Sequence, residues 1–362
     1  MIIQSFSVQN YRSIRELTLP LRQLTVVTGS NACGKSNLYR SLFLLHAAAQ
    51  GRFAQTIADE GGMPSVLWAG PRKKGSVRLT LGVTFDTGLA YSLSCGLPEI
   101  NDLPSSFRLD PLIKAETATF REGRATPAVL LDRGRSGAML RDTEGRPVEF
   151  PMMLGRSESA LVQLSEPHRF PYLTLLRETL LNWRFYHGFR TDELAPLRQP
   201  QIGVFTPALA NDGRDLAAAL QTIIEIGDSD GLYNAVRQGL GGATLEILYP
   251  LDGADRFRLR LQVPGIMRPL EAWELSDGTL RYLCLIAALL SPRLPVLLAL
   301  NEPETSLHAD LLQPLARRIV EASERTQVWV TTHSAVLADC IERLSRVSPV
   351  TLRKTDGETL VI

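Results

Sequence analysis

Cysteine and long hydrophobic runs are both scarce in this sequence. The four cysteines are dispersed, without the spacing of a metal site or a disulfide framework: Cys33, Cys95, Cys284 and Cys340. That pattern excludes a disulfide-stabilised scaffold and suits the reducing cytoplasm. The most apolar stretch, residues 283–300, is interrupted by Ser291-Pro292-Arg293 and Pro295, so it predicts a helix and a strand instead of a membrane span. Because no signal-peptide pattern opens the chain either, we expect a cytoplasmic protein with no membrane partner.

Neither sign of charge is in excess. The chain carries 39 Lys and Arg against 38 Asp and Glu, a net charge of +1, so composition alone does not indicate nucleic-acid binding. Arginine greatly outnumbers lysine, and the basic cluster Arg72-Lys73-Lys74 is open to two interpretations, a solvated loop or a DNA contact. Sustained heptads are missing, which argues against a long coiled-coil arm. With 362 residues, 44% of them hydrophobic, the chain can form one elaborated domain or two lobes around a large core.

A complete phosphate-binding motif lies near the start of the chain. Residues 29–36 read Gly-Ser-Asn-Ala-Cys-Gly-Lys-Ser, which matches G-x-x-x-x-G-K-S/T, and an apolar stretch precedes them while a helical pattern follows. The backbone N–H groups of such a loop surround phosphates, Lys35 reaches the β- and γ-phosphates, and the Ser36 hydroxyl coordinates Mg²⁺. Gly34 lets the main chain approach closely, and the helix N-terminus behind it favours anions. The sequence therefore predicts a nucleotide site here.

Three segments in the second half of the chain accompany this loop. In the first, Ser276 is placed to cap a helix, and Gly278 leaves the N–H groups of the first helical turn open to an anion. The second, residues 294–300, predicts a buried central strand that delivers Asn301-Glu302 to its carboxyl end, where ligands of α/β proteins bind. The third is a β-rich run that ends at His333.

Taken together, these motifs resemble the ATP-binding-cassette class of ATPases. The resemblance is to SMC and RecF-like heads and to the AAA family ATPases grouped with the overcoming-lysogenization-defect (OLD) ATPases. It implies that Ser276-Asp277-Gly278 is the signature loop, Asn301-Glu302 the Walker B end, residues 304–307 the D-loop and His333 the switch histidine. It also implies that Arg12, in the first strand, points toward the nucleotide. The nucleotide contacts implied within the Walker A segment are Gly29, Ser30, Asn31, Ala32, Cys33, Gly34, Lys35, Ser36 and Asn37.

The same resemblance implies a mechanism with ATP and Mg²⁺. Catalysis of phosphoryl transfer is mostly positioning and electrostatic stabilisation, here by Lys35, the metal and the loop amides. Glu302 is the candidate that polarises the attacking water, and His333 holds that water and the γ-phosphate. Ser276 and Gly278 close the site from a second subunit, so the active species is an ATP-dependent homodimer with two nucleotides between the heads.

Two departures from the family pattern affect these expectations. Asn301 replaces the Walker B aspartate, so with Ser36 it forms a metal site in which an amide stands where a carboxylate is usual. The loss is on the order of 1 to 2 kcal/mol in Mg²⁺ organisation, about a tenfold effect on rate. A binding-only ATPase is the alternative. Cys33 stands where serine is common, as a packing residue or as a thiol sensitive to alkylation because it lies near a helix N-terminus.

The fold class expected is α/β, a P-loop NTPase with an ABC-type head that has a mixed central sheet, an antiparallel β-layer and an inserted helical lobe. Residues 76–95 predict a β-hairpin, residues 116–150 a second pair of strands, and residues 171–183 and 215–226 helices of the lobe. Gln163 is the candidate for the glutamine that couples the lobes to Mg²⁺. The expected division is an N-terminal ATPase lobe at 1–165, a helical lobe at 166–290, and the rest of the ATPase core at 291–362.

Two functions remain open at this stage. The first is a compact ATP-hydrolysing head, without an appended nuclease domain, that acts on DNA or gates a partner effector in genome maintenance or defence. The second is a binding-only ATP sensor that controls a separately encoded nuclease or toxin. A transporter subunit is disfavoured, since the inserted lobe and the Glu274–Gly278 signature fit the RecF-like branch better.

Overall fold

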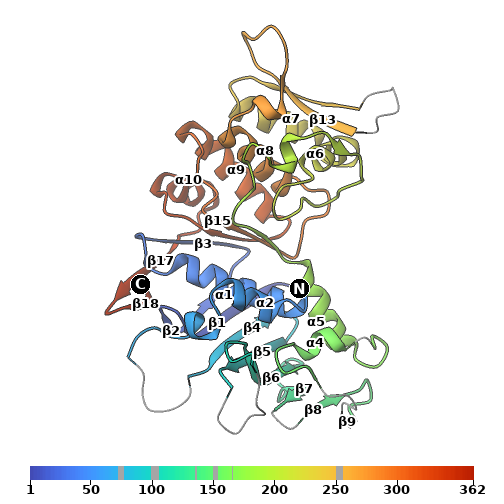
Figure 1. Ribbon diagram of the computed structural model, residues 1–362, viewed down its shortest axis with the longest axis vertical. Helices are drawn as coiled ribbons and strands as arrows, with labels where there is room; N and C mark the ends of the chain where they lie inside the picture. The colour runs from blue at the N-terminus through green and yellow to red at the C-terminus, as the bar shows by residue number, and fades with distance from the viewer. Residues whose placement is uncertain (72–76, 99–105, 135–136, 150–153, 165, 250–255) are drawn as a thin grey trace. The chain divides into compact units, whose positions relative to one another are not determined.

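The computed structural model describes residues 1–71, 77–98, 106–134, 137–149, 154–164, 166–249 and 256–362. The basic cluster Arg72-Lys73-Lys74 lies outside these described residues. The chain forms two compact units, each built from discontinuous segments (Figure 1). The phosphate-loop unit contains Met1–Arg22, Gly29–Trp183 and Thr351–Ile362, and the strand-end unit contains Gln23–Thr28 and Arg184–Val350. The three-part division at 165/166 and 290/291 stays a prediction.

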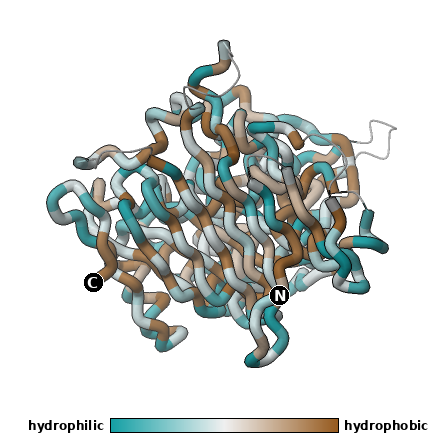
Figure 2. Tube along the Cα trace, turned by 90° about the horizontal axis from the view of Figure 1, so that it is seen from below, coloured by the Kyte–Doolittle hydropathy of each residue, from teal (hydrophilic) through white to brown (hydrophobic). Residues whose placement is uncertain are grey.

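The phosphate-loop unit is built on an eight-stranded antiparallel sheet with the order β2-β1-β4-β5-β6-β7-β8-β9. Its strands are β1 (Ile3–Tyr11), β2 (Ile14–Pro20), β4 (Leu79–Phe85), β5 (Leu89–Gly96), β6 (Leu112–Phe120), β7 (Ala128–Arg133), β8 (Ala138–Arg141) and β9 (Pro147–Glu149). The hairpin predicted over residues 76–95 is confirmed as β4 and β5, which pair antiparallel. Alternating residues of these strands are buried, and the change of hydropathy along the chain is visible in Figure 2.

The expectation of two strands over residues 116–150 is wrong in number, because the chain makes four strands there, β6 to β9. Gly123 at φ +56° and Gly145 at φ +75° lie in the connections β6–β7 and β8–β9. Glycine adopts this left-handed region readily, so each interrupts the extended run and reverses the chain.

Helices and a C-terminal hairpin complete the phosphate-loop unit. They are α1 (Lys35–Ala49), α2 (Phe53–Asp59), α3 (Met63–Val66), α4 (Ala160–Gln163), α5 (Pro171–Asn182), and the antiparallel pair β17 (Val350–Thr355) and β18 (Glu358–Val361). Helix α1 packs against β1 and β4, and β18 lies beside β2. Both ends of the chain therefore contribute to the surroundings of the phosphate loop, although they are more than three hundred residues apart in sequence.

The strand-end unit contains parallel strands in the order β10-β15-β16-β3. They are β10 (Arg184–Tyr186), β15 (Leu297–Asn301), β16 (Gln327–Thr331) and β3 (Leu24–Gly29), whose last residue begins the phosphate loop. Strand β15 was expected from residue 294 and begins at Leu297, after Pro295, which cannot donate a ladder hydrogen bond. Residues 297–300 are fully buried, as expected of a central strand.

The remaining elements of this unit are helical or short strands. The helices are α6 (Leu216–Ile226), α7 (Ser229–Gly239), α8 (Asp277–Leu289), α9 (Leu312–Ser323) and α10 (Ala335–Ser345), with 3₁₀ turns η1 (Pro196–Arg198), η2 (Ala272–Glu274) and η3 (Ala309–Leu311). A small antiparallel sheet is formed by β11 (Gln201–Ile202), β12 (Thr244–Leu248), β13 (Arg256–Gln262) and β14 (Leu270–Glu271). The helices expected at 171–183, 215–226 and after Ser276 are present as α5, α6 and α8, but α5 belongs to the phosphate-loop unit while α6 and α8 belong to this one.

Helix α8 passes through the hydrophobic core of the strand-end unit. Residues 282–289 are all buried and pack with side chains from α6, α7, α9 and the parallel strands. Burying one leucine side chain contributes about 1.5–3 kcal/mol. Because this helix is buried on all sides, its position is set by the core, and so is the position of the loop that precedes it.

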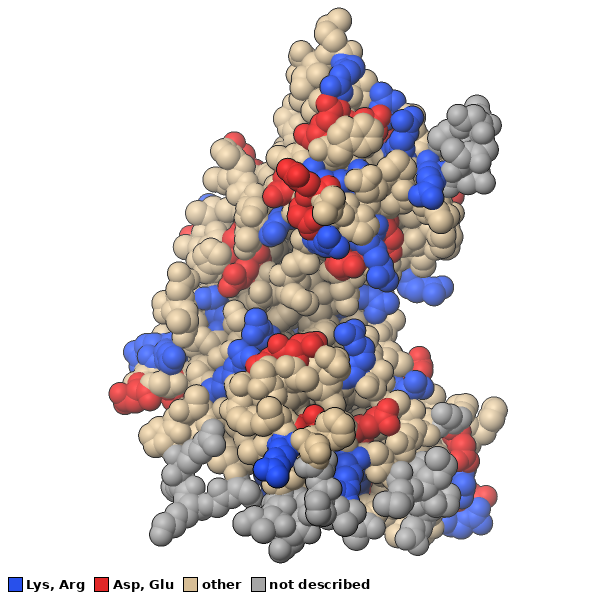
Figure 3. Space-filling model, in the orientation of Figure 1, with Lys and Arg blue, Asp and Glu red and all other residues tan. Residues whose placement is uncertain are grey.

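No helix within the described ranges combines the length and the apolar character needed to cross a membrane. The face in Figure 3 shows basic and acidic side chains interspersed over both units. The sequence carries the two signs in near-equal numbers.

Candidate nucleotide site

The phosphate loop connects β3 to α1 through three residues with positive φ. They are Gly29 (φ +149°), Ala32 (φ +61°) and Gly34 (φ +109°), and helix α1 begins at Lys35 immediately after. The strand and helix predicted on either side of the motif are both present. The side chain of Lys35 is 5% exposed, and its ammonium donates hydrogen bonds to the carbonyls of Gly29 at 2.7 Å and Ser30 at 3.0 Å. The loop therefore has its fixed cation at its centre.

A threonine of the C-terminal hairpin, Thr359, contacts the backbone of the phosphate loop. The buried hydroxyl of Thr359 donates to the carbonyl of Cys33 at 2.8 Å, and a Cβ on Gly34 would lie only 2.1 Å from that hydroxyl oxygen. Gly34 is thus required by the protein's own packing, in addition to any approach of phosphate. Sequence reasoning missed Thr359, because nothing local links β18 to a loop at the other end of the chain.

The other residues of the motif differ in exposure. Ser30, Asn31, Ala32 and Ser36 are exposed and therefore accessible to a ligand. Cys33 is 1% exposed, which favours the packing interpretation of this residue over an alkylation-sensitive thiol. Asn37, which was expected to contact the nucleotide, donates its amide to the Ser13 hydroxyl at 2.8 Å.

Arg12, expected to point toward the nucleotide, is held by a carboxylate of its own unit. Its guanidinium lies 2.7 Å from Glu60, which also accepts the hydroxyl of Tyr11 at 2.6 Å. Burial, together with the negative charge of Glu60, raises the pKa of Tyr11 well above its usual value, so this hydroxyl stays a donor. Arg12 has φ +49°, and its Nε is buried without a partner among the described residues. A contact with nucleotide would have to share Arg12 with Glu60.

In the strand-end unit, the ends of β15 and β16 bring several predicted residues together. We call Asn301, Glu302, Glu304, Thr331, Thr332 and His333 the strand-end cluster. The register pairs Asn301 with Thr331, whose hydroxyl donates to the Asn301 side-chain oxygen at 2.7 Å. Glu302 follows with φ +49°, and its N–H donates to the Thr331 carbonyl at 2.8 Å. A non-glycine residue in this conformation is strained, which is typical of functional sites.

Glu304 connects the segment predicted as the D-loop to His333, the predicted switch histidine. Its Oε1 accepts the Thr332 hydroxyl at 2.6 Å and the N–H groups of His333 and Ser334 at 3.0 and 3.1 Å, and it lies 3.1 Å from His333 Nδ1. Glu304 is 8% exposed, and its Oε2 has no partner among the described residues. Sequence reasoning named Glu304 only as part of the D-loop. The missed signal was a carboxylate directly after a buried strand, where unsatisfied backbone donors of the next strand end converge.

A cleft of about 270 Å³ opens beside this cluster, within the strand-end unit. Its lining includes residues 186–189, Arg281 of α8, and Asn301 and Glu302. The Glu302 carboxylate has no hydrogen bond or ion pair with another described residue. It is therefore available to orient a water molecule in the cleft.

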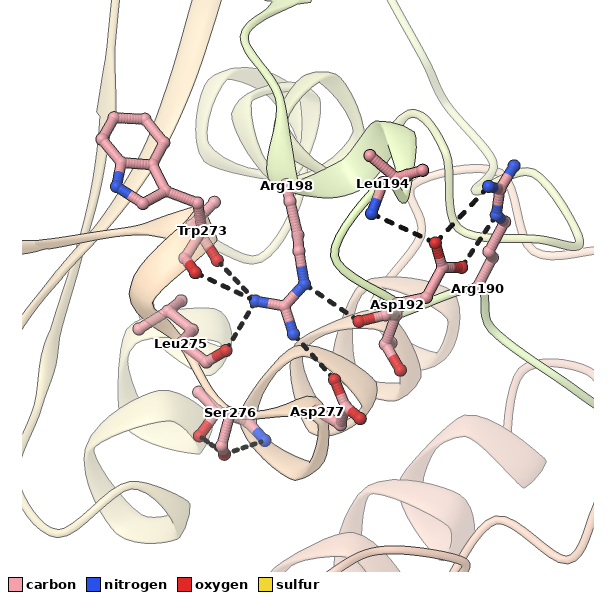
Figure 4. A network of polar contacts seen from close by, with 11 residues as sticks. Arg190, Asp192, Leu194, Arg198, Trp273, Leu275, Ser276 and Asp277 are labelled. Carbon is pink, nitrogen blue, oxygen red and sulfur yellow. Dashed lines mark hydrogen bonds and ion pairs between the residues drawn. The ribbon is translucent and has the colours of Figure 1, made fainter.

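The segment predicted as the signature loop leads into helix α8. Ser276 is the N-cap, and its hydroxyl accepts the N–H of Thr279 at 3.2 Å. The requirement for Gly278 has a second cause: a Cβ there would lie 2.5 Å from the carbonyl oxygen of Ser306 in the D-loop. Arg198, at the end of η1, holds the residues that lead into this helix (Figure 4).

The donors expected for Mg²⁺ are an exposed hydroxyl, Ser36, and an amide oxygen, Asn301, which Thr331 also engages. Within the described ranges, no group of three or more His, Cys, Asp or Glu side chains is arranged to hold a metal. Mg²⁺ commonly takes one or two oxygen ligands from protein and is held otherwise by substrate phosphates and waters, so the Ser36 hydroxyl and the Asn301 amide oxygen are each of a type that suits it. Gln163 donates its amide to Glu158 at 3.0 Å, and its role as the coupling glutamine stays a prediction.

The phosphate loop and the strand-end cluster each fall within a segment that matches a known family. Residues 155–339, just over half of the chain, match the family described as "AAA domain, putative AbiEii toxin, Type IV TA system". The chain belongs to this AAA ATPase family. Residues 1–66 match a second description, "AAA ATPase domain". A comparison with curated protein sequences gave no significant match.

Solved structures of SMC head domains share the fold of this AAA ATPase. An Smc head bound to the C-winged helix domain of ScpA is 14% identical with a TM-score of 0.58, covering 100% of this chain and 98% of that one. An Smc head with an extended coiled coil, bound to the C-terminal domain of ScpA derived from Pyrococcus furiosus, is 13% identical with a TM-score of 0.50, covering 100% and 96%. The predicted AAA family ATPase is confirmed by the family match, which supports a nucleotide-binding function, and the predicted P-loop, ABC-type head fold is confirmed by its likeness to the SMC heads.

Proposed function

We propose that this AAA ATPase binds ATP with Mg²⁺, hydrolyses it slowly, and forms a head-to-head homodimer while ATP is bound. The observation that carries hydrolysis is the state of Glu302: a strained residue at the end of a buried strand, whose carboxylate lies in a cleft and has no partner among the described residues. Such a carboxylate can orient a water and accept its proton. Strain of this kind persists only where the surrounding structure holds it.

The other proposed site residues stabilise charge on the phosphates or position the reacting groups. Lys35 stabilises charge that develops on the γ-phosphoryl oxygens, and Ser36 and Asn301 hold Mg²⁺, which neutralises charge on the phosphates. His333, whose side chain is half exposed, reaches the γ-phosphate and the water while Glu304 holds its backbone. The proposed nucleotide contacts are Arg12, residues 29–37, Ser276 and Gly278. The amide of Asn301, in place of the usual aspartate, supports slow turnover. A protein that binds ATP without hydrolysing it, as a sensor, is the alternative function that Asn301 favours.

The proposed dimer is supported by the surroundings of the signature loop. Leu194 and Trp273 are both exposed large hydrophobic residues that flank Arg198 and the loop (Figure 4). Ser276 and Asp277, at the start of α8, are also exposed. Apolar side chains beside an anion-binding helix end suit a surface that a second head covers.

For the molecule on which this ATPase acts, we propose two classes, a partner protein and DNA. The SMC heads with this fold were solved bound to ScpA, which supports a protein partner, and the matching family description refers to a toxin of a toxin–antitoxin system, which supports a role in defence. DNA is the other client that we propose, in genome maintenance. We place these activities in the cytoplasm. ATP turnover stimulated by added DNA would favour DNA as the client. Co-purification with a nuclease would favour a partner effector.

The decisive experiment uses Glu302→Gln. This variant should bind ATP as tightly as wild type but lose turnover by about 100-fold or more, because only the group that polarises water is changed. In light scattering with ATP and Mg²⁺, its mass should shift toward that of a dimer. Adding Ser276→Arg should remove the shift, since a bulky cation then occupies the trans phosphate contact.

The matched control is Glu321→Gln, which neutralises an exposed carboxylate of α9 paired with Arg318. It should hydrolyse ATP like wild type. If Glu302→Gln has the same mass with and without ATP, the gated dimer is wrong; if it also retains turnover, Glu302 is not the catalytic carboxylate.

A further inference from the structure

One arginine holds most of the segment that leads into the signature helix. Arg198 is 7% exposed, and its Nη1 donates to the carbonyls of Ala272, Trp273 and Leu275 at 3.3, 3.3 and 2.7 Å. Its Nε donates to the Thr191 carbonyl at 2.9 Å. These carbonyls belong to a 3₁₀ turn and the chain after it, where backbone acceptors have few regular partners. The planar guanidinium with its five donors can serve them together, which an ammonium cannot.

The same guanidinium neutralises a charge inside the signature loop. Its Nη2 lies 2.7 Å from the Asp277 carboxylate, which is 60% exposed and sits between Ser276 and Gly278, the proposed contacts to the phosphate of a second subunit. A free carboxylate at that point would repel a phosphate by Coulomb interaction and would weaken the attraction of the helix N-terminus for anions.

The other carboxylates of this segment are paired in the same manner. Glu271 lies 3.4 Å from Arg260, and Glu274 lies 2.6 Å from Arg268. Hydrogen bonds from Arg268 lower the pKa of Glu274 to about 2. Each acidic side chain from 271 to 277 is therefore matched by an arginine, and the Arg198–Asp277 pair is the one within the signature loop itself.

We propose that Arg198 is a positioning residue of the ATPase reaction. It sets the backbone of residues 272–275 that aims Ser276 and Gly278, and it compensates the Asp277 charge so that the loop accepts the phosphate of a second subunit. This inference rests on the proposed ATP-dependent dimer. It predicts that Arg198 affects the closed dimer and its turnover and leaves nucleotide binding to the phosphate loop unchanged.

The test compares Arg198→Gln, Asp277→Asn and the double variant in the full-length chain. Arg198→Gln should keep the wild-type dissociation constant for ATP in the monomer within about twofold, while the protein concentration at half dimerisation rises at least about tenfold and kcat falls. Asp277→Asn retains the cation and its carbonyl contacts, so it should dimerise at least as tightly as wild type. The double variant should recover part of the loss of Arg198→Gln, because the uncompensated carboxylate is gone.

Controls separate this inference from the proposed function. Arg190→Gln removes an exposed ion pair with Asp192 in the same region and should match wild type. If wild type itself does not dimerise with ATP, the proposed function fails. If wild type dimerises but Arg198→Gln does so equally well, or if the double variant recovers nothing, the inference is wrong. Should Arg198→Gln fail to fold by thermal unfolding, Asp277→Asn decides: a weaker dimer in that variant would overturn charge compensation.

Discussion

The phosphate loop and the strand-end cluster are built in different ways. The loop is eight consecutive residues whose shape follows from three positive φ angles and a helix that starts at Lys35. The cluster takes its residues from the ends of two strands, β15 and β16, and its geometry depends on the parallel register that places Asn301 opposite Thr331. A local motif can be identified from sequence with its geometry, whereas a cluster assembled by register can be identified only by its residue types.

The two regions also use buried charge differently. Lys35 is bonded to backbone carbonyls of its own loop, so its charge remains available to a ligand that displaces them. Glu304 is bonded to one hydroxyl and two N–H groups of another strand end, so its charge stabilises the protein. Changes in the loop should therefore affect binding first, and changes in the cluster should affect stability and binding together.

The largest effect is expected for Lys35→Ala. Removing the cation at the centre of the loop should reduce ATP affinity by about 100-fold or more, since charged hydrogen bonds to phosphate are among the strongest in proteins. Isothermal calorimetry measures this directly. The control is Lys354→Ala, an exposed lysine of β17, which should bind like wild type. Unchanged affinity in Lys35→Ala would show that the phosphate loop is misassigned.

Glu304→Ala is expected to lower both the stability of the protein and its turnover. It leaves the Thr332 hydroxyl and the N–H groups of His333 and Ser334 without their acceptor, which should lower the free energy of unfolding by about 2–4 kcal/mol. Turnover should fall as well, because His333, the proposed switch histidine, loses the acceptor that holds its backbone. Chemical denaturation and steady-state kinetics measure the two effects, with Asp310→Ala, at an exposed D-loop neighbour, as control. Full stability with full activity would remove the proposed link between D-loop and histidine.

Asn301→Asp tests the strand-end cluster through Mg²⁺ binding, and its expected effect on turnover is smaller. The carboxylate can still accept the Thr331 hydroxyl and should strengthen Mg²⁺ binding, so turnover should rise about fivefold in Mg²⁺-dependent assays. A slower enzyme would mean that the site is adapted to the neutral amide and holds ATP for long periods, as a sensor would.

The smallest effect concerns pH and a residue away from both regions. Burial is the main cause that raises the pKa of Asp215, at the start of α6, so protonation is favoured in the folded state. Its contribution to stability is fully present below the unfolded pKa of about 4 and is lost as pH rises through the higher folded pKa. Asp215→Asn can still accept the Ala210 N–H, and should therefore gain stability relative to wild type between pH 4 and 7.

Thermal unfolding at several pH values measures this trend. Asp192→Asn provides a control of opposite sign, because the hydrogen bond from Arg190 lowers the pKa of Asp192. That carboxylate contributes above its unfolded pKa and loses its contribution as the pH falls through the folded pKa. Parallel curves for the two variants would contradict both assignments.

Several features of this protein were predictable from sequence because they depend on near neighbours. The phosphate loop, the cap at Ser276, the hairpin of β4 and β5 and the buried strand β15 each follow from local spacing, turn chemistry or hydrophobic pattern. The family resemblance added roles to Glu302 and His333. Those roles required no knowledge of which side chains lie near them.

Other features were decided by tertiary structure alone. Thr359 supports Gly34, Glu60 holds Arg12, and Ser306 approaches Gly278, each across a gap in sequence that no local pattern spans. Arg198 and Asp277 are 79 residues apart, and neither residue's neighbours indicate the other. Changes of a few tenths of an ångström in the donor–acceptor distance decide whether a hydrogen bond forms. Those distances are set by how buried elements such as α8 pack, and packing is a property of the whole core.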